Sequence, residues 1–288
     1  MLNKLNFILL LGQIFSMKTQ FLSIFVLLFL FFGCKTNVIT GKKTLNFFGD
    51  NQSLFPTSFQ QYRSFLDEHE VVTGTKDASA VARIGNDIAN AAALYYAYLG
   101  TPNGLDNYAW EYNLVKSEQV NAWCMPGGKI VFYTGIMPVA KNPDGIATIM
   151  GHEVAHALAD HGAQRMSLGI VQQAGGLVTA QATKKEDERK RQQIMMAYGI
   201  GTTVGGMLPF SRKHETEADK IGLTLMTLAG YNPEEAPKLW ERMKAQSKGG
   251  VPEFLSSHPS EERRIANLQE WIPQAKAIAD EIKLTQKK

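Results

Sequence analysis

Residues 144–160 have the sequence DGIATIMGHEVAHALAD, and the predicted fold depends on the pentapeptide His152-Glu153-Val154-Ala155-His156 inside it. Two histidines four residues apart lie on one face of a helix, so both imidazoles can reach a single metal ion. Glu153 points to the adjoining part of that face, where it can accept a proton from a water held by the metal. Zinc bound by two histidines and one carboxylate keeps a fourth position open for that water, which is the arrangement of a hydrolytic site.

A helix can also carry two histidines as part of a solvent-exposed polar stripe, but the surrounding residues argue against that alternative. Outside the polar trio, residues 145–159 are almost all apolar or small. Asp144, which follows Pro143, is the predicted N-cap of this helix. The trio is therefore expected within a mostly buried helix, where polar groups need partners and a metal ion is an effective one.

The composition is typical of a globular protein, with 288 residues of which 44% are hydrophobic and 20% are charged. This length is sufficient for one sizeable domain with a small appendage. The formal net charge is +3, and no arginine-rich face stands out. The slightly basic charge therefore indicates no nucleic-acid partner.

Residues 1–33 are predicted to be a targeting segment. Met17-Lys18 provides a short basic start, and the run from Phe21 to Phe32 (FLSIFVLLFLFF) is uncharged. Such a run is short for a membrane span and typical of the core of a signal peptide. Gly33-Cys34 follows at once, and a small residue before cysteine resembles a bacterial lipoprotein signal, in which the cysteine is acylated.

Two alternatives remain open at this end of the chain. Residues 7–11 form a second apolar run, so either the chain starts at Met17 or both runs act together as an uncleaved anchor. Cys124 is the second of the two cysteines. We expect it to be a buried structural thiol if Cys34 is acylated, and a Cys34–Cys124 disulfide is the less favoured alternative.

Helices and strands are predicted between the targeting segment and the metal-binding helix. Residues 53–70 and a segment from Asp77 to just before Gly100 have the spacing of core helices. Residues 108–116, 120–125 and 129–134 have the pattern of strands, with a turn at Pro126-Gly127-Gly128. These strands predict a small antiparallel sheet beside the metal-binding helix.

Beyond Asp160 the pattern is helical to the C-terminus. Breaks are predicted near Gly175-Gly176, Gly205-Gly206, Gly230, Gly249-Gly250 and Pro259. The stretch Ile194–Phe210 carries no charge and could be a membrane span. Its glycines, threonines and borderline length instead favour a buried helix or a membrane-facing hairpin.

A catalytic zinc needs a third protein ligand, and the best candidate is in the segment 211–219, SRKHETEAD. Glu215 and Asp219 are four residues apart and share one helix face. Glu215 could bind the metal while Asp219 accepts the free ring N–H of a zinc-bound histidine. Glu217 lies on another face, where an acidic helix start is favoured by the helix dipole. His214 is a competing but less favoured ligand.

The pairing of His-Glu-x-x-His with Glu-x-Glu-Ala-Asp resembles the gluzincin metallopeptidases of the CAAX prenyl protease and HtpX type. Further matching blocks are Asn121–Gly135, Ser257-His258-Pro259-Ser260 with Arg264-Ile265, and Cys34 with Asn37–Gly41. The resemblance covers nearly all of residues 34–270, and Trp123 stands where phenylalanine is more usual. It implies an α+β, predominantly helical zincin-type fold and a lipid-tethered branch of the family.

The resemblance also implies roles for individual residues. One zinc ion per chain would be held by His152, His156 and Glu215, with Glu153 as the general base and Asp219 behind the ligands. The strand Lys129–Tyr133 would be the edge strand that pairs with an extended peptide substrate.

Further substrate contacts are expected near Asn121, where Gly127 and Gly128 would let the substrate backbone approach closely. A plain hairpin turn is the alternative for the two glycines, and both can hold. His258 and Arg264 are candidates for stabilising an oxyanion. The alternatives are that His258 is a fourth zinc ligand or a helix cap, and that Arg264 pairs with a core carboxylate.

The sequence thus predicts a zinc-dependent endopeptidase, anchored through a lipid on Cys34 in the bacterial cell envelope. The predicted location is the outer membrane, facing the periplasm, and the predicted substrates are misfolded or membrane-associated proteins. The rival is an envelope chaperone or assembly factor with the same fold. The predicted division is a signal peptide over 1–33, a tether and N-terminal helix over 34–75, and a zinc metallopeptidase domain over 76–288. His161 is expected to be a solvated helix end.

Overall fold

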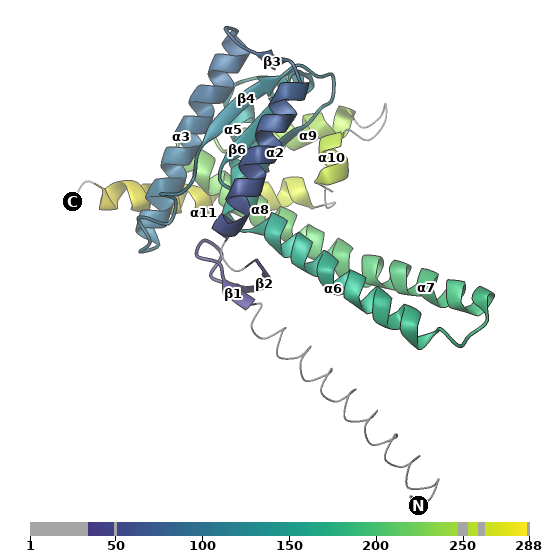
Figure 1. The fold of residues 1–288 in the computed structure, drawn as a ribbon. Helices are drawn as coiled ribbons and strands as arrows, with labels where there is room; N and C mark the ends of the chain where they lie inside the picture. Colours follow the sequence, from purple (N-terminus) through teal and green to yellow (C-terminus); the bar gives the residue numbers. More distant parts are fainter. Residues whose placement is uncertain (1–33, 49–50, 247–252, 259–262, 287–288) are drawn as a thin grey trace, which may run out of the picture.

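The computed structural model describes residues 34–48, 51–246, 253–258 and 263–286 (Figure 1). Its strands are β1 (Cys34–Thr36), β2 (Lys43–Leu45), β3 (Val71–Val72), β4 (Glu111–Val115), β5 (Ala122–Met125) and β6 (Lys129–Tyr133). Its helices are α2 (Phe55–Glu68), α3 (Lys76–Tyr98), α4 (Met137–Ala140), α5 (Pro143–Leu158), α6 (His161–Ala182), α7 (Glu188–Thr202), α8 (Leu208–Leu228), α9 (Glu235–Gln246), α10 (Glu253–Ser257) and α11 (Arg264–Thr285). The predominantly helical α+β fold class predicted from the sequence is confirmed.

The four-stranded sheet has the order β3-β4-β6-β5. The β5–β6 pair is antiparallel as predicted, and β3, a strand that the sequence did not predict, also pairs with β4 in antiparallel. By contrast, β4 and β6 pair in parallel, with Glu111 opposite Lys129. The prediction that Lys129–Tyr133 is the edge strand was therefore wrong. Strand β6 lies between β4 and β5 and has no free edge. The edge strand at this end of the sheet is β5.

Helix α5 lies at the centre of the molecule, and every residue from Gly145 to Leu158 is buried. Its N-cap is Asn142, whose Oδ1 accepts a hydrogen bond from Gly145 N at 2.8 Å, with Pro143 in the first helical turn. The cap was predicted two residues later, at Asp144. A proline that begins a helix places the capping side chain before it.

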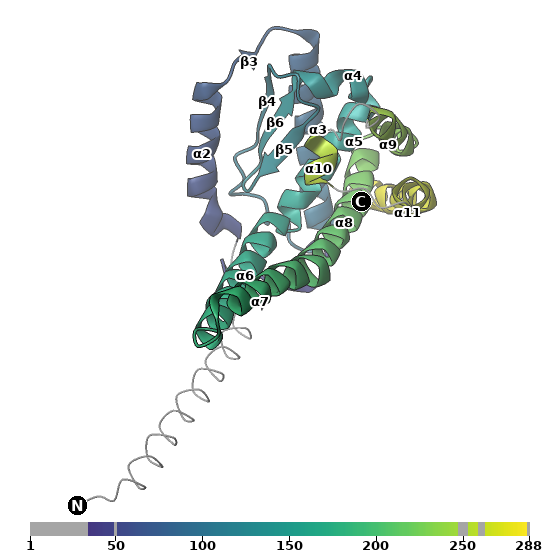
Figure 2. The ribbon, with the colours of Figure 1, turned by 90° about the vertical axis from the view of Figure 1, so that its right-hand side faces the viewer.

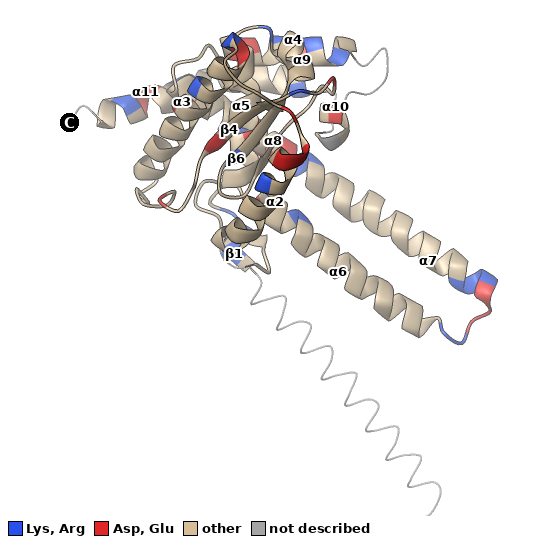
Figure 3. Cartoon of the chain, turned by 45° about the horizontal axis from the view of Figure 1, so that its top comes forward, with Lys and Arg blue, Asp and Glu red and all other residues tan. Residues whose placement is uncertain are grey.

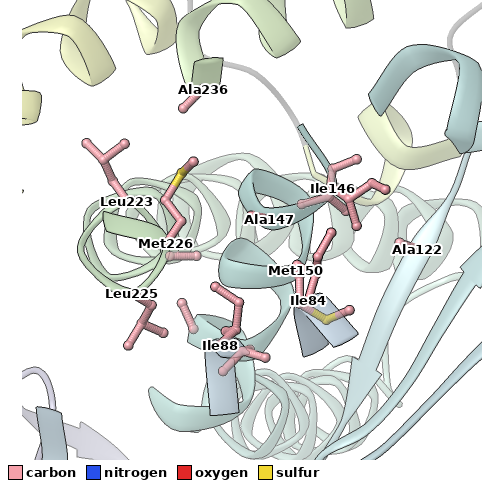
Figure 4. Close-up of a cluster of buried hydrophobic side chains, with 14 of the residues drawn as sticks. Ile84, Ile88, Ala122, Ile146, Ala147, Met150, Leu223, Leu225, Met226 and Ala236 are labelled. Atoms are coloured by element: carbon pink, nitrogen blue, oxygen red, sulfur yellow. The ribbon is translucent and has the colours of Figure 1, made fainter. Parts of the chain in front are cut away.

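Helices α5 and α8 approach closely because glycines meet at their crossing. A Cβ atom on Gly151 would lie 2.7 Å from the carbonyl oxygen of Gly222, so neither glycine can carry a side chain without displacement. Apolar side chains from α3, α5, α8 and the sheet fill the space around this crossing (Figure 4). This core fixes the position of α5 relative to α8.

Helices α6 and α7 form a long hairpin that projects from the body of the molecule (Figures 1 and 2). The break predicted at Gly175-Gly176 was wrong, since α6 runs through it. At Gly205-Gly206 the chain passes from α7 to α8 through a π-helix, Thr203–Met207, without a break. The predicted break at Gly230 is confirmed, and those at Gly249-Gly250 and Pro259 lie outside the described residues.

The residues before α2 form a short β-hairpin, β1–β2, that docks on the end of α5. Asn37 Nδ2 donates to the carbonyl oxygen of Leu158 at 2.8 Å and to Asp160 Oδ2 at 3.0 Å. Helix α2 then packs on the sheet, where the fully buried Tyr62 donates its hydroxyl to Ile130 O at 3.0 Å. The proposed domain boundary at residue 76 stays a prediction.

Candidate metal centre and substrate groove

Three elements bring the predicted metal ligands together. Helix α5 carries His152 and His156 one turn apart, and α8 packs against it with Glu215 turned inward. His258 follows α10. One ligand atom from each of these four buried residues lies within 4.8 Å of the others.

The distances within this cluster are short for unconnected side chains. His152 Nε2 lies 3.1 Å from His156 Nε2 and 3.2 Å from His258 Nδ1. Glu215 oxygens lie 3.3 Å from His152 Nε2, 3.4 Å from His156 Nε2 and 3.2 Å from His258 Nδ1. Donor atoms on a shared tetrahedral zinc are separated by about 3.3 Å, given metal–ligand bonds of about 2.0–2.1 Å. The side chains therefore fit zinc.

The charge state of Glu215 also suits a metal ligand. Burial raises the pKa of its carboxyl, but hydrogen bonds with His152, His156 and His258 outweigh burial and lower the pKa below its ordinary value. Glu215 is therefore an ionised carboxylate in a buried position, which requires a cation as its neighbour.

Asp219 and Arg264 support the cluster from the side of α8 and α11. His152 Nδ1 lies 3.0 Å from Asp219 Oδ1, so its second ring nitrogen, Nε2, is turned to the cluster. Arg264 Nη2 donates to the same Asp219 oxygen at 2.6 Å, and its guanidinium lies 3.3 Å from the centroid of the Trp240 ring. Arg264 is buried and forms ion pairs with Asp219 and Glu215. This arrangement matches the alternative in which Arg264 pairs with a core carboxylate.

Glu153 is 3% exposed, and its Oε1 accepts no hydrogen bond. Burial raises the pKa of this carboxyl, while His258 and His152 act to lower it. His258 Nε2 lies 3.4 Å from Glu153 Oε1. An unsatisfied carboxylate oxygen beside a metal-binding cluster is suited to receive a proton from a water.

His258 is placed by the side chain and backbone of Phe254. The Phe254 N–H donates to Val120 O at 3.1 Å, which ties α10 to the chain before β5. The Phe254 side chain is fully buried, and its ring centroid lies 4.7 Å from that of His258. The structure thus brings His258, but not Arg264, to the open side of the cluster.

A groove of about 520 Å³ runs from this cluster along strand β5. Glu153, His156 and His258 line it together with Ala122, Trp123, Cys124 and Met125 of β5. Its further lining residues are Leu54, Thr57, Ser58, Gln61, Asn121, Pro126, Ala157, Asp160, His161, Gly162, Arg165 and Met166. Asn121 is thus among the residues that line the groove, and its contact with a substrate stays a prediction.

Lys129, Gly127 and Gly128 do not line this groove. Lys129 lies in the enclosed strand β6 and pairs with Glu111 at 3.0 Å. Both glycines have positive φ angles, of 84° and 85°. A Cβ atom would meet the Phe59 ring at 2.5 Å in one case and the Trp110 ring at 2.5 Å in the other. The expected substrate approach at these glycines is contradicted, because the protein's own aromatic rings cover them.

The prediction that His161 is a solvated helix end was wrong, because His161 is 1% exposed. Its Nδ1 lies 2.9 Å from His156 Nδ1, and its Nε2 lies 3.0 Å from Glu217 Oε2. His214 stacks on the His161 ring with centroids 3.9 Å apart and is not a member of the metal cluster. The sequence offered no clear signal for this contact, because an interval of five residues does not place two side chains on one helix face.

Comparison with known proteins identifies the family. The profile described as peptidase family M48 matches residues 79–272, which is more than half of the chain. The chain belongs to peptidase family M48. This assignment confirms the resemblance to gluzincin metallopeptidases and the prediction of zinc as the metal of this family.

Individual M48 relatives carry peptidase names. The mitochondrial metalloendopeptidase OMA1 of Saccharomyces cerevisiae is 39% identical over 62% of this chain and 51% of its own length. Its Schizosaccharomyces pombe counterpart is 36% identical over 60% of this chain and 50% of its own length. The beta-barrel assembly-enhancing protease of Escherichia coli is 28% identical over 55% of this chain and 33% of its own length. The chain spans about half the length of the first two relatives.

These relatives correct the predicted location. The prediction of a bacterial outer-membrane lipoprotein was wrong by this comparison, because the relatives with 36% and 39% identity are mitochondrial. In the described part of the chain, no helix combines the length and apolarity needed to cross a membrane. Cys34 and Cys124 are not joined by a disulfide, which excludes that alternative in this structure.

Proposed function

We propose that this M48 protein is a zinc-dependent endopeptidase that cleaves extended segments of protein substrates in the groove beside β5. The observation that carries the proposal is the buried cluster of His152, His156, Glu215 and His258, with the unsatisfied Glu153 carboxylate at its edge. The metalloendopeptidase names of its relatives support the same activity.

Each residue has a distinct task in this proposal. Zinc, when bound by His152, His156 and Glu215, supplies a Lewis acid that polarises a peptide carbonyl and lowers the pKa of water. Glu153 takes the proton of the attacking water and returns it to the leaving amine. Asp219 accepts the His152 Nδ1–H and so keeps Nε2 free of a proton.

Strand β5 is the proposed binding edge for the substrate. As the last strand of its sheet, it can accept an added strand through main-chain hydrogen bonds, which recognise an extended backbone more than a particular side chain. The groove admits an extended segment and not a folded domain. Misfolded or membrane-associated proteins are therefore the proposed substrates.

Attachment to a membrane is a further part of the proposal. The apolar run Phe21–Phe32 ends just before Cys34, which is exposed at the start of β1. Intact mass measurement of the protein purified from its own cells would reveal acylation of Cys34. An unmodified mass would contradict the lipid, and an uncleaved apolar anchor would then be the remaining means of attachment.

The deciding experiment compares the full chain with its Glu153→Gln variant for zinc content and casein cleavage. We expect about one zinc per chain in both proteins and a loss of cleavage on the order of 100-fold or more in the variant. Glu70→Gln is the matched control, since Glu70 is exposed and forms an exposed ion pair with Lys116.

Undiminished cleavage by Glu153→Gln would contradict the role of Glu153. Zinc without cleavage in the unsubstituted protein would favour the assembly-factor alternative. In that case the unsubstituted and Glu153→Gln proteins would suppress aggregation of an unfolded substrate equally well.

A further inference from the structure

The α6–α7 hairpin, residues 161–208, carries most of the exposed large apolar side chains of the molecule. Of the twelve found in the described residues, nine lie on it. They are Met166, Ile170, Val171, Leu177, Val178, Met196, Ile200, Val204 and Leu208. Leu177 is 73% exposed and Met196 is 66% exposed. Apolar side chains gathered at this density on one projection mark a contact surface.

The apolar residues have helical spacing on both arms of the hairpin. Met166, Ile170, Ala174 and Val178 follow one another at intervals of four on α6. Met196, Ile200, Val204 and Leu208 do the same from α7 to α8. All of these side chains are exposed. Each arm therefore presents an apolar stripe outward.

The stripes have no partner in the described part of the molecule. The arms contact each other through other residues, with Tyr198 donating its hydroxyl to Gln172 O at 2.8 Å and Gln172 bonding Thr202 at 2.8 Å. None of the described residues of α7 is buried, and the buried residues of α6 are confined to its first two turns, up to Ser167.

Charge is confined to the two ends of the hairpin, as Figure 3 shows. Residues 166–183 and 192–211 contain no Asp, Glu, Lys or Arg. The tip has the sequence KKEDERKR over residues 184–191, with five basic and three acidic side chains. Apolar arms with a net basic tip match the acyl chains and anionic headgroups of a lipid bilayer.

The path of the chain favours a bilayer over a second protein copy as the occupant. The uncharged run Phe21–Phe32 ends just before β1, and β1 pairs with β2. The chain after β2 is attached to the base of the hairpin, where Phe47 N donates to Ser167 Oγ at 2.9 Å. A membrane that receives residues 21–32 therefore lies within reach of the stripes, which begin at Met166.

We propose that the α6–α7 hairpin lies in the interfacial region of a lipid bilayer, with its apolar stripes among the acyl chains and its basic tip on anionic headgroups. The hairpin does not span the bilayer. Because Arg165 and Met166 at its base also line the groove, this docking holds the groove at the membrane surface.

The test places a tryptophan on the hairpin of the full chain and mixes the protein with vesicles of phosphatidylcholine and phosphatidylglycerol brominated on their acyl chains. Leu177→Trp reports from the exposed apolar surface of α6, next to Val178 of the stripe. Leu284→Trp is the matched control, because Leu284 is 63% exposed on α11, away from the hairpin. Both changes replace one exposed apolar side chain by another, so the fold should be kept, and zinc content verifies this.

We expect the bromines to reduce the added fluorescence of Leu177→Trp about two-fold or more and to leave that of Leu284→Trp unchanged. Replacing Lys184, Lys185, Arg189 and Arg191 by glutamine should weaken this quenching several-fold on the anionic vesicles. The reporter position separates hairpin contact from any binding by residues 21–32.

Equal, negligible quenching at both positions would overturn the proposal. A blue shift of Leu177→Trp that depends on protein concentration and not on vesicles would also overturn it, and would assign the stripes to a second copy of the chain. Because quenching does not depend on peptide cleavage, these outcomes are independent of the proposed enzymatic activity.

Discussion

His161 Nδ1 lies 2.9 Å from Nδ1 of His156, a proposed metal ligand, and both rings are buried. The other nitrogen of His161, Nε2, lies 3.0 Å from Glu217 Oε2, so it carries the proton and donates to the carboxylate. Burial lowers the pKa of His161, which keeps the ring neutral. His161 Nδ1 is then an acceptor for the His156 Nδ1–H, and the lone pair of His156 Nε2 is directed to the metal cluster.

His161→Phe should therefore weaken zinc binding by about 10–100-fold, which is the usual effect of removing a group that orients a metal ligand. Phenylalanine keeps the aromatic stack on His214 but cannot accept a hydrogen bond. Competition with a fluorescent chelator would measure the affinity. His69→Phe is the control, since His69 is exposed and belongs neither to the metal cluster nor to the lining of the groove. An unchanged zinc affinity would show that the His156 ring is held by packing alone.

His258→Ala should retain zinc and raise kcat/KM. In the structure His258 Nδ1 is part of the ligand cluster, where it would fill the position that a water and a substrate carbonyl need. Removing the imidazole leaves three protein ligands and an open fourth position. Zinc analysis and steady-state cleavage of a peptide measure both effects. A fall in kcat by about 100-fold or more would instead assign His258 to oxyanion stabilisation.

Arg264→Met should destabilise the protein by about 3–5 kcal/mol, because it leaves the buried carboxylate of Asp219 without its cationic partner. Urea unfolding in the presence of zinc measures the change. Arg83→Met is the control, because the Arg83 side chain is 57% exposed and its pairing with Asp87 should contribute less than about 1 kcal/mol. Similar losses of unfolding free energy in the two variants would show that the charge of Arg264 contributes little to stability.

Two glycine substitutions should have effects of opposite sign. Gly151→Ala places a Cβ against the backbone of Gly222 and should cost about 1–3 kcal/mol of unfolding free energy. Gly169→Ala on α6 meets no atom within 4 Å and should stabilise by about 0.5–1 kcal/mol, because alanine favours the helix. Thermal unfolding compares the two. Equal changes of unfolding free energy in the two variants would mean that helices α5 and α8 can move apart to accommodate the added Cβ atom.

Part of the site could be predicted because its chemistry is local. His152, Glu153 and His156 lie within five residues of sequence, and helical spacing alone places them on adjoining faces. The four-residue interval from Glu215 to Asp219 is equally local. These residues needed only the correct secondary structure to be recognised as a group.

The parts that were missed depend on long-range packing. The enclosure of β6 follows from its parallel pairing with β4, and no turn signal encodes a pairing across that distance. His161 reaches His156 because Asp160 adopts a left-handed conformation, with φ of 59°, between α5 and α6. A non-glycine residue in this conformation is uncommon and gives no clear signal in the sequence.

The attachment of Asn37 to Leu158 and Asp160 has a mechanical consequence. Any tension applied to the chain upstream of Cys34 is transmitted through β1–β2 to Asn37, and from there to the carbonyl oxygen of Leu158. Leu158 is two residues beyond His156 on the same helix. The load therefore arrives at the end of the helix that bears both histidines.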